Sequence, residues 1–496
     1  MTSKNMKQLL ALVVVLVACM AFYAWFSSHK DEEQKKEEEK NTVEADAILE
    51  IKKSNLKNIK YVYNKKNYEI VYNKSKKKGS LKGKEKWPIN QDTISTMVDS
   101  VTSILAERTM DGTDKEEYGL DKPSKKIVVN AKEDDDTKSY TLLFGNKAPN
   151  DAGYYFMIDG EEKIYVVSKT IFDAFEYDAV GLLKVDLIDS VNSSLVYDVN
   201  ISSKDFNLKA KYDGDIRAGD GTWKITKPYA KEKKGVSSIF TEYFVNYESL
   251  AYDKCVAYKP SKLSKYGLDK PAFSVDLKYY EEVTGEADSK DKEADVTYNK
   301  KTFTLLVGDG VKENYEGEEL LTRYYVMEKG GDRVYTMESS TAESIMNNSA
   351  FAFVDGTING TELMEYSSVE IETADKTYKI QKENKTVENE DGEKTIEYTY
   401  KLNDKKIKTT KGDSVSSTLY ALNYSGEIGN KKIKKDKTEV TIRYNGRKDG
   451  AKDLVVKFLN YDDTSYRVNK GGEEIFLISI EDVEGLIESL KSAANK

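Results

Sequence analysis

Tyr118-Gly119-Leu120-Asp121-Lys122-Pro123 is the stretch from which the organisation of this 496-residue chain can be deduced. The same six residues return as Tyr266-Gly267-Leu268-Asp269-Lys270-Pro271, at a separation of 148 (266 − 118). Six identical residues at a fixed separation indicate an internal repeat, which is the first property to establish about a fold. We therefore expect copies of one structural unit along the chain.

The hexapeptide has the composition of a turn that begins a strand. Its glycine can adopt positive φ at no steric cost. Its proline fixes φ and restrains the preceding lysine to an extended conformation. We predict that its tyrosine and leucine anchor the turn in a core. The alternative makes Asp121 or Asp269 a catalytic or ligand residue, but a catalytic loop is rarely kept twice in one chain together with its flanking strands.

Each of the two clear copies is predicted to begin with a hairpin and a helix. Alternating residues over 59–72 predict two strands around a turn, and apolar residues between Ile94 and Leu105 recur with helical spacing. Trp87-Pro88-Ile89 and Trp223-Lys224-Ile225 are matched as equivalent short strands of the two copies. Strands with turn residues between them follow each hexapeptide.

The second copy is longer than the first. Tyr165 matches Tyr335 at a separation of 170 (335 − 165), so about 22 residues (170 − 148) are inserted after the hexapeptide. We expect them in polar, exposed loops near 281–294 and 309–319. A third, weaker copy lacks the hexapeptide, and terminal copies of an array are often atypical.

These patterns predict an α+β fold: tandem repeats of a mostly antiparallel β-sheet unit with one or two packed helices, behind an N-terminal transmembrane helix. The predicted ranges are listed here: a signal anchor at 1–27, a charged stalk at 28–47, repeat 1 at 48–185, repeat 2 at 186–354 and a degenerate repeat 3 at 355–496.

The anchor is predicted from the uninterrupted apolar run Leu9–Phe26. Its 18 residues would form a helix of about 27 Å, close to the ~30 Å hydrocarbon core of a bilayer. Lys4 and Lys7 precede it, so the positive-inside rule places the rest of the chain outside the cytoplasm. The alternative is a lipoprotein signal ending at Cys19, although apolar residues continue beyond that cysteine.

The composition excludes several kinds of catalytic site. His29 is the single histidine and Cys255 is the single cysteine outside the apolar run, so a Ser-His-Asp triad, a Cys-His dyad and a His- or Cys-rich zinc site are excluded from the folded part. The net charge of −9 argues against nucleic-acid binding. We expect no enzyme activity, catalytic residue, cofactor or metal. Carboxylate-based hydrolysis is the remaining enzymatic alternative, since it needs only two converging acids.

Residues 50–87 form a basic stretch close to the predicted anchor. They contain 13 Lys and 3 Glu, a balance of +10 (13 − 3). Such a stretch could contact anionic lipid or an anionic wall polymer. The alternative is a solvated hairpin with lysines on its outer side.

The Trp strand, the helix, the Tyr-Gly-Leu-Asp-x-Pro turn, the Thr-Leu-Leu-x-Gly strand and the Tyr-Tyr strand, behind an N-terminal anchor, resemble a bacterial family known as domain of unknown function 4340. The resemblance covers roughly residues 60–350 and, more weakly, the rest. It implies no established activity. Members are often encoded beside ABC-type export permeases and gliding-motility transport components. The resemblance therefore implies an extracytoplasmic accessory or scaffold protein whose partner is a multi-spanning permease. A cell-wall polymer or ligand-binding module is the alternative.

Overall fold

The computed structural model describes residues 47–111, 114–133, 136–188, 190–285, 296–315, 317–388, 394–429, 437–450 and 452–495. The predicted anchor and nearly all of the predicted stalk lie outside this range. No helix in the described part is long and apolar enough to cross a membrane. Two compact units are distinguished. One comprises the chain up to 187 with 252–262 and 332–337, and the other comprises 188–251, 263–331 and 338–496.

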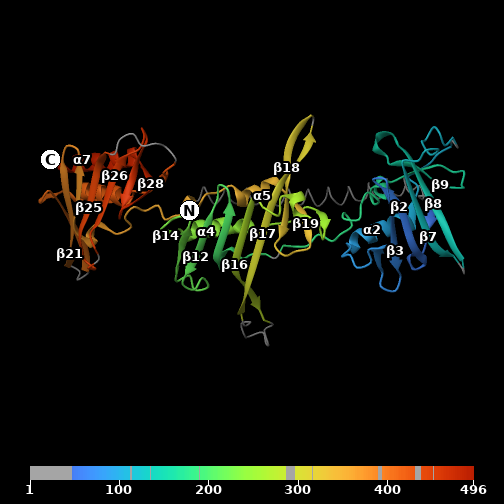
Figure 1. Ribbon diagram of the computed structural model, residues 1–496, viewed down its shortest axis with the longest axis horizontal. Coiled ribbons are helices and arrows are strands. Elements are labelled where there is room, and N and C mark those ends of the chain that lie inside the picture. The colour runs from blue at the N-terminus through green and yellow to red at the C-terminus, as the bar shows by residue number, and fades with distance from the viewer. Residues whose placement is uncertain are drawn as a thin grey trace, which may run out of the picture. The chain divides into compact units, whose positions relative to one another are not determined.

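The first unit contains an antiparallel sheet whose strands lie in the order β4-β3-β2-β7-β8-β9-β10-β6 (Figure 1). A hairpin, β2–β3, continues into β4 on one side, and β7 to β10 follow on the other. The bounds are β2 (Leu56–Tyr63), β3 (Lys66–Asn73), β4 (Lys78–Leu81), β6 (Arg108–Thr109), β7 (Lys125–Glu133), β8 (Asp136–Lys147), β9 (Tyr154–Ile158) and β10 (Tyr165–Val167). A separate pair joins β1 (Ala47–Glu50) to β5 (Ser103–Leu105).

One face of this sheet is covered by α2 (Gln91–Thr102) and by the segment that follows α3 (Lys169–Asp173). The predicted stripe is confirmed, because Ile94, Met97, Val98 and Val101 are buried on α2. The Asn90 side chain caps this helix by accepting from the backbone N–H of Asp92. The register Ile59↔Ile70 places two fully buried side chains beneath it. The opposite face of the hairpin therefore carries the exposed residues of both strands.

The second copy has the same strand order within the second unit: β14-β13-β12-β11-β16-β17-β18. Its bounds are β11 (Val196–Ser203), β12 (Leu208–Asp213), β13 (Thr222–Lys227), β14 (Lys233–Gly235), β16 (Phe273–Thr284), β17 (Val296–Tyr315) and β18 (Glu318–Glu328), with α4 (Ser237–Glu248) and α5 (Ser339–Met346). Trp223 lies in the core, stacked on Phe240 of α4 at 4.1 Å between ring centroids. In the first unit, β15 (Cys255–Tyr258) pairs antiparallel with β19 (Arg333–Glu338).

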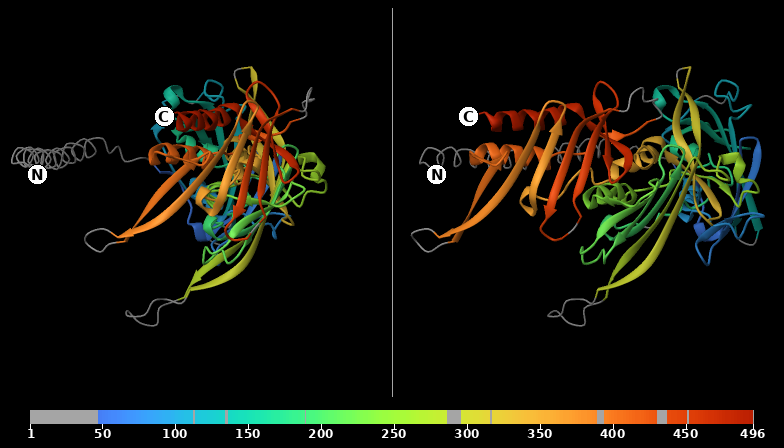
Figure 2. Two further views of the ribbon diagram at one scale, coloured as in Figure 1. Left: turned by 90° about the vertical axis from the view of Figure 1, so that its left-hand side faces the viewer. Right: turned by 60° about the vertical axis from the view of Figure 1, so that its left-hand side comes forward.

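The C-terminal region forms a third antiparallel sheet in the order β23-β22-β21-β20-β25-β26-β27-β28-β24. Its bounds are β20 (Tyr366–Thr373), β21 (Thr377–Glu388), β22 (Lys394–Leu402), β23 (Lys405–Ile407), β24 (Gly426–Glu427), β25 (Thr438–Arg447), β26 (Leu454–Asn460), β27 (Ser465–Lys470) and β28 (Glu473–Ser479). Helices α6 (Thr409–Tyr420) and α7 (Ile480–Ala494) lie side by side on it (Figure 2). The α+β class and the repeated sheet units are thus confirmed.

The match between the two tryptophan strands is wrong. The helices start 146 residues apart (237 − 91), and the isolated bridges Ile89↔Leu183 and Gly235↔Val354 begin at the same separation (235 − 89). The tryptophans are 136 apart (223 − 87), so they are not equivalent. Trp223 lies within β13, whereas Trp87 lies outside the strands at the position that corresponds to Lys233. Two copies that diverged in loop length can place the same residue type in different elements.

The extra residues of the second copy lengthen strands instead of forming loops, which also corrects an expectation. β16 and β17 stay paired as far as Thr284↔Val296, and β17 and β18 as far as Tyr315↔Glu318. Figure 1 shows β17 and β18 reaching beyond the other strands of their sheet. Backbone pairing satisfies the N–H and C=O groups of this long segment, so polar composition did not prevent strand formation.

Candidate functional site

The two hexapeptides occupy the same structural position in their copies. Tyr118 and Tyr266 are buried, and each ring contacts a tyrosine of a neighbouring strand: Tyr155 at 4.6 Å and Tyr325 at 5.1 Å between centroids. Leu120 and Leu268 are each only 2% exposed. The apolar residues of both turns therefore contact the core beside the next hairpin of strands.

A second glycine meets each turn from a strand. Gly119 and Gly267 have φ of +69° and +67°. A Cβ on Gly145 would lie 2.1 Å from the Tyr118 carbonyl oxygen, and one on Gly308 would lie 2.0 Å from that of Tyr266. Side chains other than hydrogen are excluded at such distances, so the close backbone approach requires glycine.

The polar residues of the hexapeptides do not converge on a site. Asp121 and Asp269 are exposed, as are Lys122 and Lys270, while Pro123 and Pro271 are half-buried. The charged contact of Asp121 is with its neighbour Lys122, at 4.0 Å. Across the described ranges, no group of three or more His, Cys, Asp or Glu side chains is placed to hold a metal ion.

Aspartates that are 169 residues apart (355 − 186) form ion pairs at corresponding places in the chain. In the first unit, Asp186 accepts hydrogen bonds from Arg333 Nη1 at 2.6 Å and Tyr335 Oη at 2.7 Å. In the second unit, Asp355 pairs with Lys234 Nζ at 3.0 Å and accepts from Thr357 Oγ1 at 2.7 Å. These carboxylates are used to join segments, because each is held by a cation and a hydroxyl donor.

Cys255 is buried in β15, as its small apolar character suggested. Burial raises the pKa of its thiol to about 11, with the nearby Arg333 lowering it only in part. A thiol with a raised pKa is a poor nucleophile at neutral pH. The structure therefore offers no activation of this cysteine.

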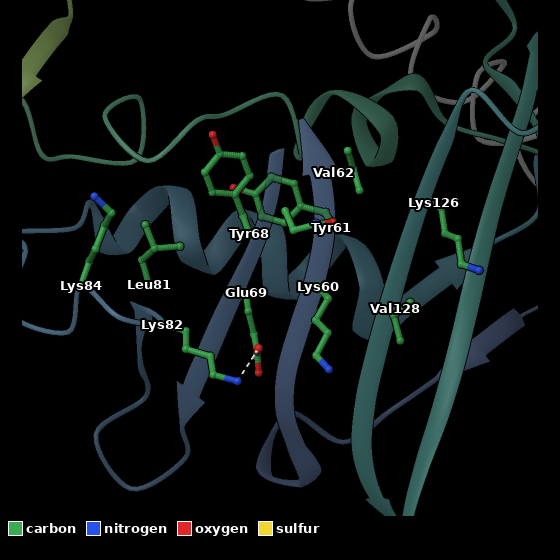
Figure 3. Close-up of a pocket in the computed structure, with 11 residues that line it drawn as sticks. Lys60, Tyr61, Val62, Tyr68, Glu69, Leu81, Lys82, Lys84, Lys126 and Val128 are labelled. Atoms are coloured by element: carbon green, nitrogen blue, oxygen red, sulfur yellow. Dashed lines mark hydrogen bonds and ion pairs between the residues drawn. The ribbon is translucent and has the colours of Figure 1, made fainter. Parts of the chain in front are cut away.

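The open face of the first sheet is the most strongly basic surface with defined geometry. We call it the lysine face and define it by Lys60, Glu69, Lys82, Lys84 and Lys126. Lys60 lies between Glu69 of β3 and Val128 of β7 in the register of the sheet. Figure 3 shows these side chains on adjacent strands around a shallow hollow of about 600 Å³.

Little of the positive charge on this face is neutralised. Lys82 pairs with Glu69 at 2.8 Å, and Lys84 Nζ lies 3.5 Å from the centroid of the Trp87 ring. Lys60 and Lys126 are exposed and have no carboxylate within 4 Å in the described part of the chain. The five residues carry a net charge of +3 (4 Lys − 1 Glu).

The same segment is less basic in the other copies. Counted from a corresponding start to the residue before the helix, residues 50–90 have a balance of +10 (13 − 3), 190–236 of +3 (9 − 6) and 360–408 of −3 (9 − 12). Carboxylates also pair with bases on the second sheet, where Lys278 contacts Asp198 at 3.0 Å and Lys224 contacts Asp213 at 2.6 Å. The basic stretch predicted from sequence is therefore a distinctive surface of the first copy.

The second copy carries a different exposed feature, the β17–β18 arm, defined as residues 311–315 and 317–323. Tyr315 is 67% exposed, Leu320 is 46% exposed and Leu321 is 37% exposed. The register Glu313↔Leu320 puts Leu320 and Tyr315 on one face of the arm. Neither surface was predicted from motifs, although the 22-residue expansion marked the arm.

Comparison with known proteins identifies one family. The family model described as "Domain of unknown function (DUF4340)" matches residues 80–244 and 223–439. The matches together span 360 of 496 residues (439 − 80 + 1), and the model matches twice, as an internal repeat requires. The search of curated proteins and the search of solved structures each found no match.

Proposed function

The chain belongs to the DUF4340 family, and we propose that it is a non-enzymatic, extracytoplasmic scaffold, anchored in the membrane and associated with an ABC-type envelope transport complex. In this proposal residues 1–27 form the transmembrane anchor, and the copies of the sheet unit present surfaces to the membrane-embedded permease. The polar side chains with defined partners act as structural joints, as Asp186 and Asp355 do.

The observation that carries the proposal is the exposed apolar face of the β17–β18 arm. Tyr315 and Leu320 leave 67% and 46% of their surface in contact with solvent, on strands that reach beyond their sheet. Apolar and tyrosine side chains that project in this way are typical of protein–protein contacts, because burial against a partner removes them from water. The arm also carries the Glu313–Arg323 ion pair at 2.8 Å, which stiffens it without covering Tyr315.

The arm is an addition to a copy that is otherwise built like its neighbours. A segment that exceeds the shared unit and exposes apolar residues has no evident role in the core of that unit. We infer that its role is recognition, and that the repeats supply a rigid support for it.

Affinity purification of the full chain in mild detergent tests this function. We expect a multi-spanning permease to be recovered with the wild-type protein. The double variant Tyr315→Ser/Leu320→Ser should lose the permease while keeping its own unfolding temperature. Ile396→Ser is the matched control, because Ile396 is 58% exposed on the third sheet. Repeated recovery of the wild-type chain alone would contradict the proposal.

A further inference from the structure

We propose that the lysine face of the first copy lies against anionic lipid head groups of the membrane that holds the anchor. This inference rests on the anchor in the proposed function but not on any permease. It concerns a surface, the open side of β2, β3 and β7, that no core contact uses. Its occupant is identified by charge, by accompanying apolar side chains and by the length of chain that connects it to the bilayer.

Charge complementarity is the first argument. The lysine face has a net charge of +3, and Lys60 and Lys126 have no carboxylate partner within 4 Å in the described chain. Each lysine close to an anionic membrane surface strengthens binding roughly fivefold. Lys65 and Lys66 at the hairpin turn extend the same charge beyond the face.

The apolar side chains on this face suit an interface between water and lipid. Val62 is 45% exposed and Val71 is 39% exposed, and both project from the hairpin on the side of Lys60. Lysines bury their aliphatic stems along such residues while the ammonium groups reach phosphate. The shallow hollow between Lys60, Lys82 and Lys126 is of a size to accept a head group.

The covalent connection is the third argument. The apolar run ends at Phe26 and the first strand begins at Ala47, so 20 residues (47 − 26 − 1) separate them. Fully extended, they would span at most about 70 Å. The first copy therefore stays within reach of the bilayer, and a tethered surface binds at a raised effective concentration. The later copies, with balances of +3 and −3, lack this attraction.

Lysine acylation of the full chain in lipid nanodiscs tests the inference. Nanodiscs of phosphatidylcholine alone are compared with nanodiscs containing 30% phosphatidylglycerol, and acylation rates are read by mass spectrometry. We expect Lys60, Lys82 and Lys126 to react at least about fivefold more slowly in the anionic nanodiscs. The protection should disappear in 0.5 M NaCl, where charges on the surface are screened within a few ångströms. Lys379 and Lys401 of the third sheet are internal controls.

A charge-removing variant sharpens the test. Lys60→Gln/Lys126→Gln should abolish the protection of Lys82 with no change in unfolding temperature, because both side chains are exposed. Lys379→Gln/Lys401→Gln should leave it intact. Equal acylation in the two kinds of nanodisc would overturn the inference, as would a chain that fails to stay with nanodiscs at high salt.

A competing anion distinguishes lipid from polymer. Soluble poly(glycerol phosphate) is added to the neutral nanodiscs at the same total phosphate concentration as the phosphatidylglycerol. Equal or stronger protection of the three lysines by the polymer would overturn the assignment to lipid and favour a wall polymer. Protection in anionic nanodiscs without recovery of a permease would support this inference and contradict only the transport association.

Discussion

The phenol of Tyr335 donates a 2.7 Å hydrogen bond to Oδ2 of Asp186, which lies 149 residues earlier in the chain. Arg333 Nη1 donates to Oδ1 of the same carboxylate at 2.6 Å. β19 is thereby held to the segment that ends the first copy, inside one compact unit. In the second unit, the corresponding Asp355 is held by Lys234 and Thr357, so one sequence position performs the same joining role with different partners.

Replacement of Tyr335 by Phe should lower the free energy of unfolding by about 1 kcal/mol, the value expected for one hydrogen bond to a partly exposed charge. The ring stays in place against Tyr252, to which it is stacked at 4.1 Å between centroids, so only the hydroxyl contact is removed. Urea-induced unfolding followed by tryptophan fluorescence measures the change. Tyr315→Phe is the control, since that side chain is 67% exposed, and it should have no effect. An unchanged Tyr335→Phe protein would mean that Arg333 alone holds Asp186.

Three glycine-to-alanine variants of the second copy should separate backbone conformation from steric exclusion. Gly330 has φ of +84° and open space around its Cα, so Gly330→Ala should cost about 1 kcal/mol from conformation alone. Gly308 carries no positive φ, but its Cβ would lie 2.0 Å from the Tyr266 carbonyl oxygen, and we expect a cost of about 3 kcal/mol. Gly267→Ala combines both effects, with φ of +67° and a Cβ 2.7 Å from the backbone nitrogen of Asp309.

Thermal and urea unfolding should therefore rank the variants as Gly330→Ala least and Gly308→Ala or Gly267→Ala most destabilised. A Gly308→Ala protein as stable as the wild type would show that the hexapeptide does not require the observed backbone approach.

Asp355 should make stability depend on acidic pH. Burial acts to raise the pKa of this carboxyl, but hydrogen bonds from Thr357 and Lys234 outweigh it, and the pKa is lowered from the ordinary 3.8. The folded state therefore binds this proton less tightly than the unfolded state. Its contribution to stability is complete above pH 3.8 and is lost as the pH falls through the folded-state pKa.

The variant Asp355→Asn should be less stable than wild type by about 1–2 kcal/mol at pH 7, and the difference should shrink below pH 3.8. Chemical unfolding at a series of pH values measures it. Asp404→Asn is the control, because its side chain is 75% exposed. A constant difference down to pH 2 would assign the effect to packing instead of charge.

Cys255 should react slowly with alkylating reagents in the folded protein. Burial raises its thiol pKa to about 11 from the ordinary 9.0, so the thiolate fraction at pH 8 falls roughly 100-fold. Iodoacetamide labelling of a Cys19→Ser variant, native and in urea, measures the ratio of rates. Rapid labelling of the native protein would show that β15 opens often enough to expose the thiol.

Much of the local structure could be predicted because it depends on neighbours in the chain. The period of the apolar residues from Ile94 to Val101 identifies a helix face wherever that helix lies. The hexapeptide, with a glycine at positive φ and a proline before a strand, behaves as its residue types dictate. The mispairing of Trp87 with Trp223 shows the limit, since residue identity does not reveal which strand a residue enters.

The candidate surfaces depended on contacts between distant segments. The charge of residues 50–87 was evident, but only the pairing of β2 with β7 brings Lys126 beside Lys60. Likewise, polar residues near 309–319 were expected in a loop, and their backbone pairing with β18 made them an arm.

The sequence by itself determined the repeated α+β unit, its antiparallel strands and its helix faces, because periodicity and turn chemistry act over a few residues. Tertiary structure alone decided where charge stays unpaired, which apolar residues stay exposed and where glycine is obligatory. Gly412 of α6 illustrates the reason: its Cβ would lie 2.1 Å from Cγ of Tyr400. That constraint comes from a side chain brought against the helix by folding, and no pattern within the helix contains it.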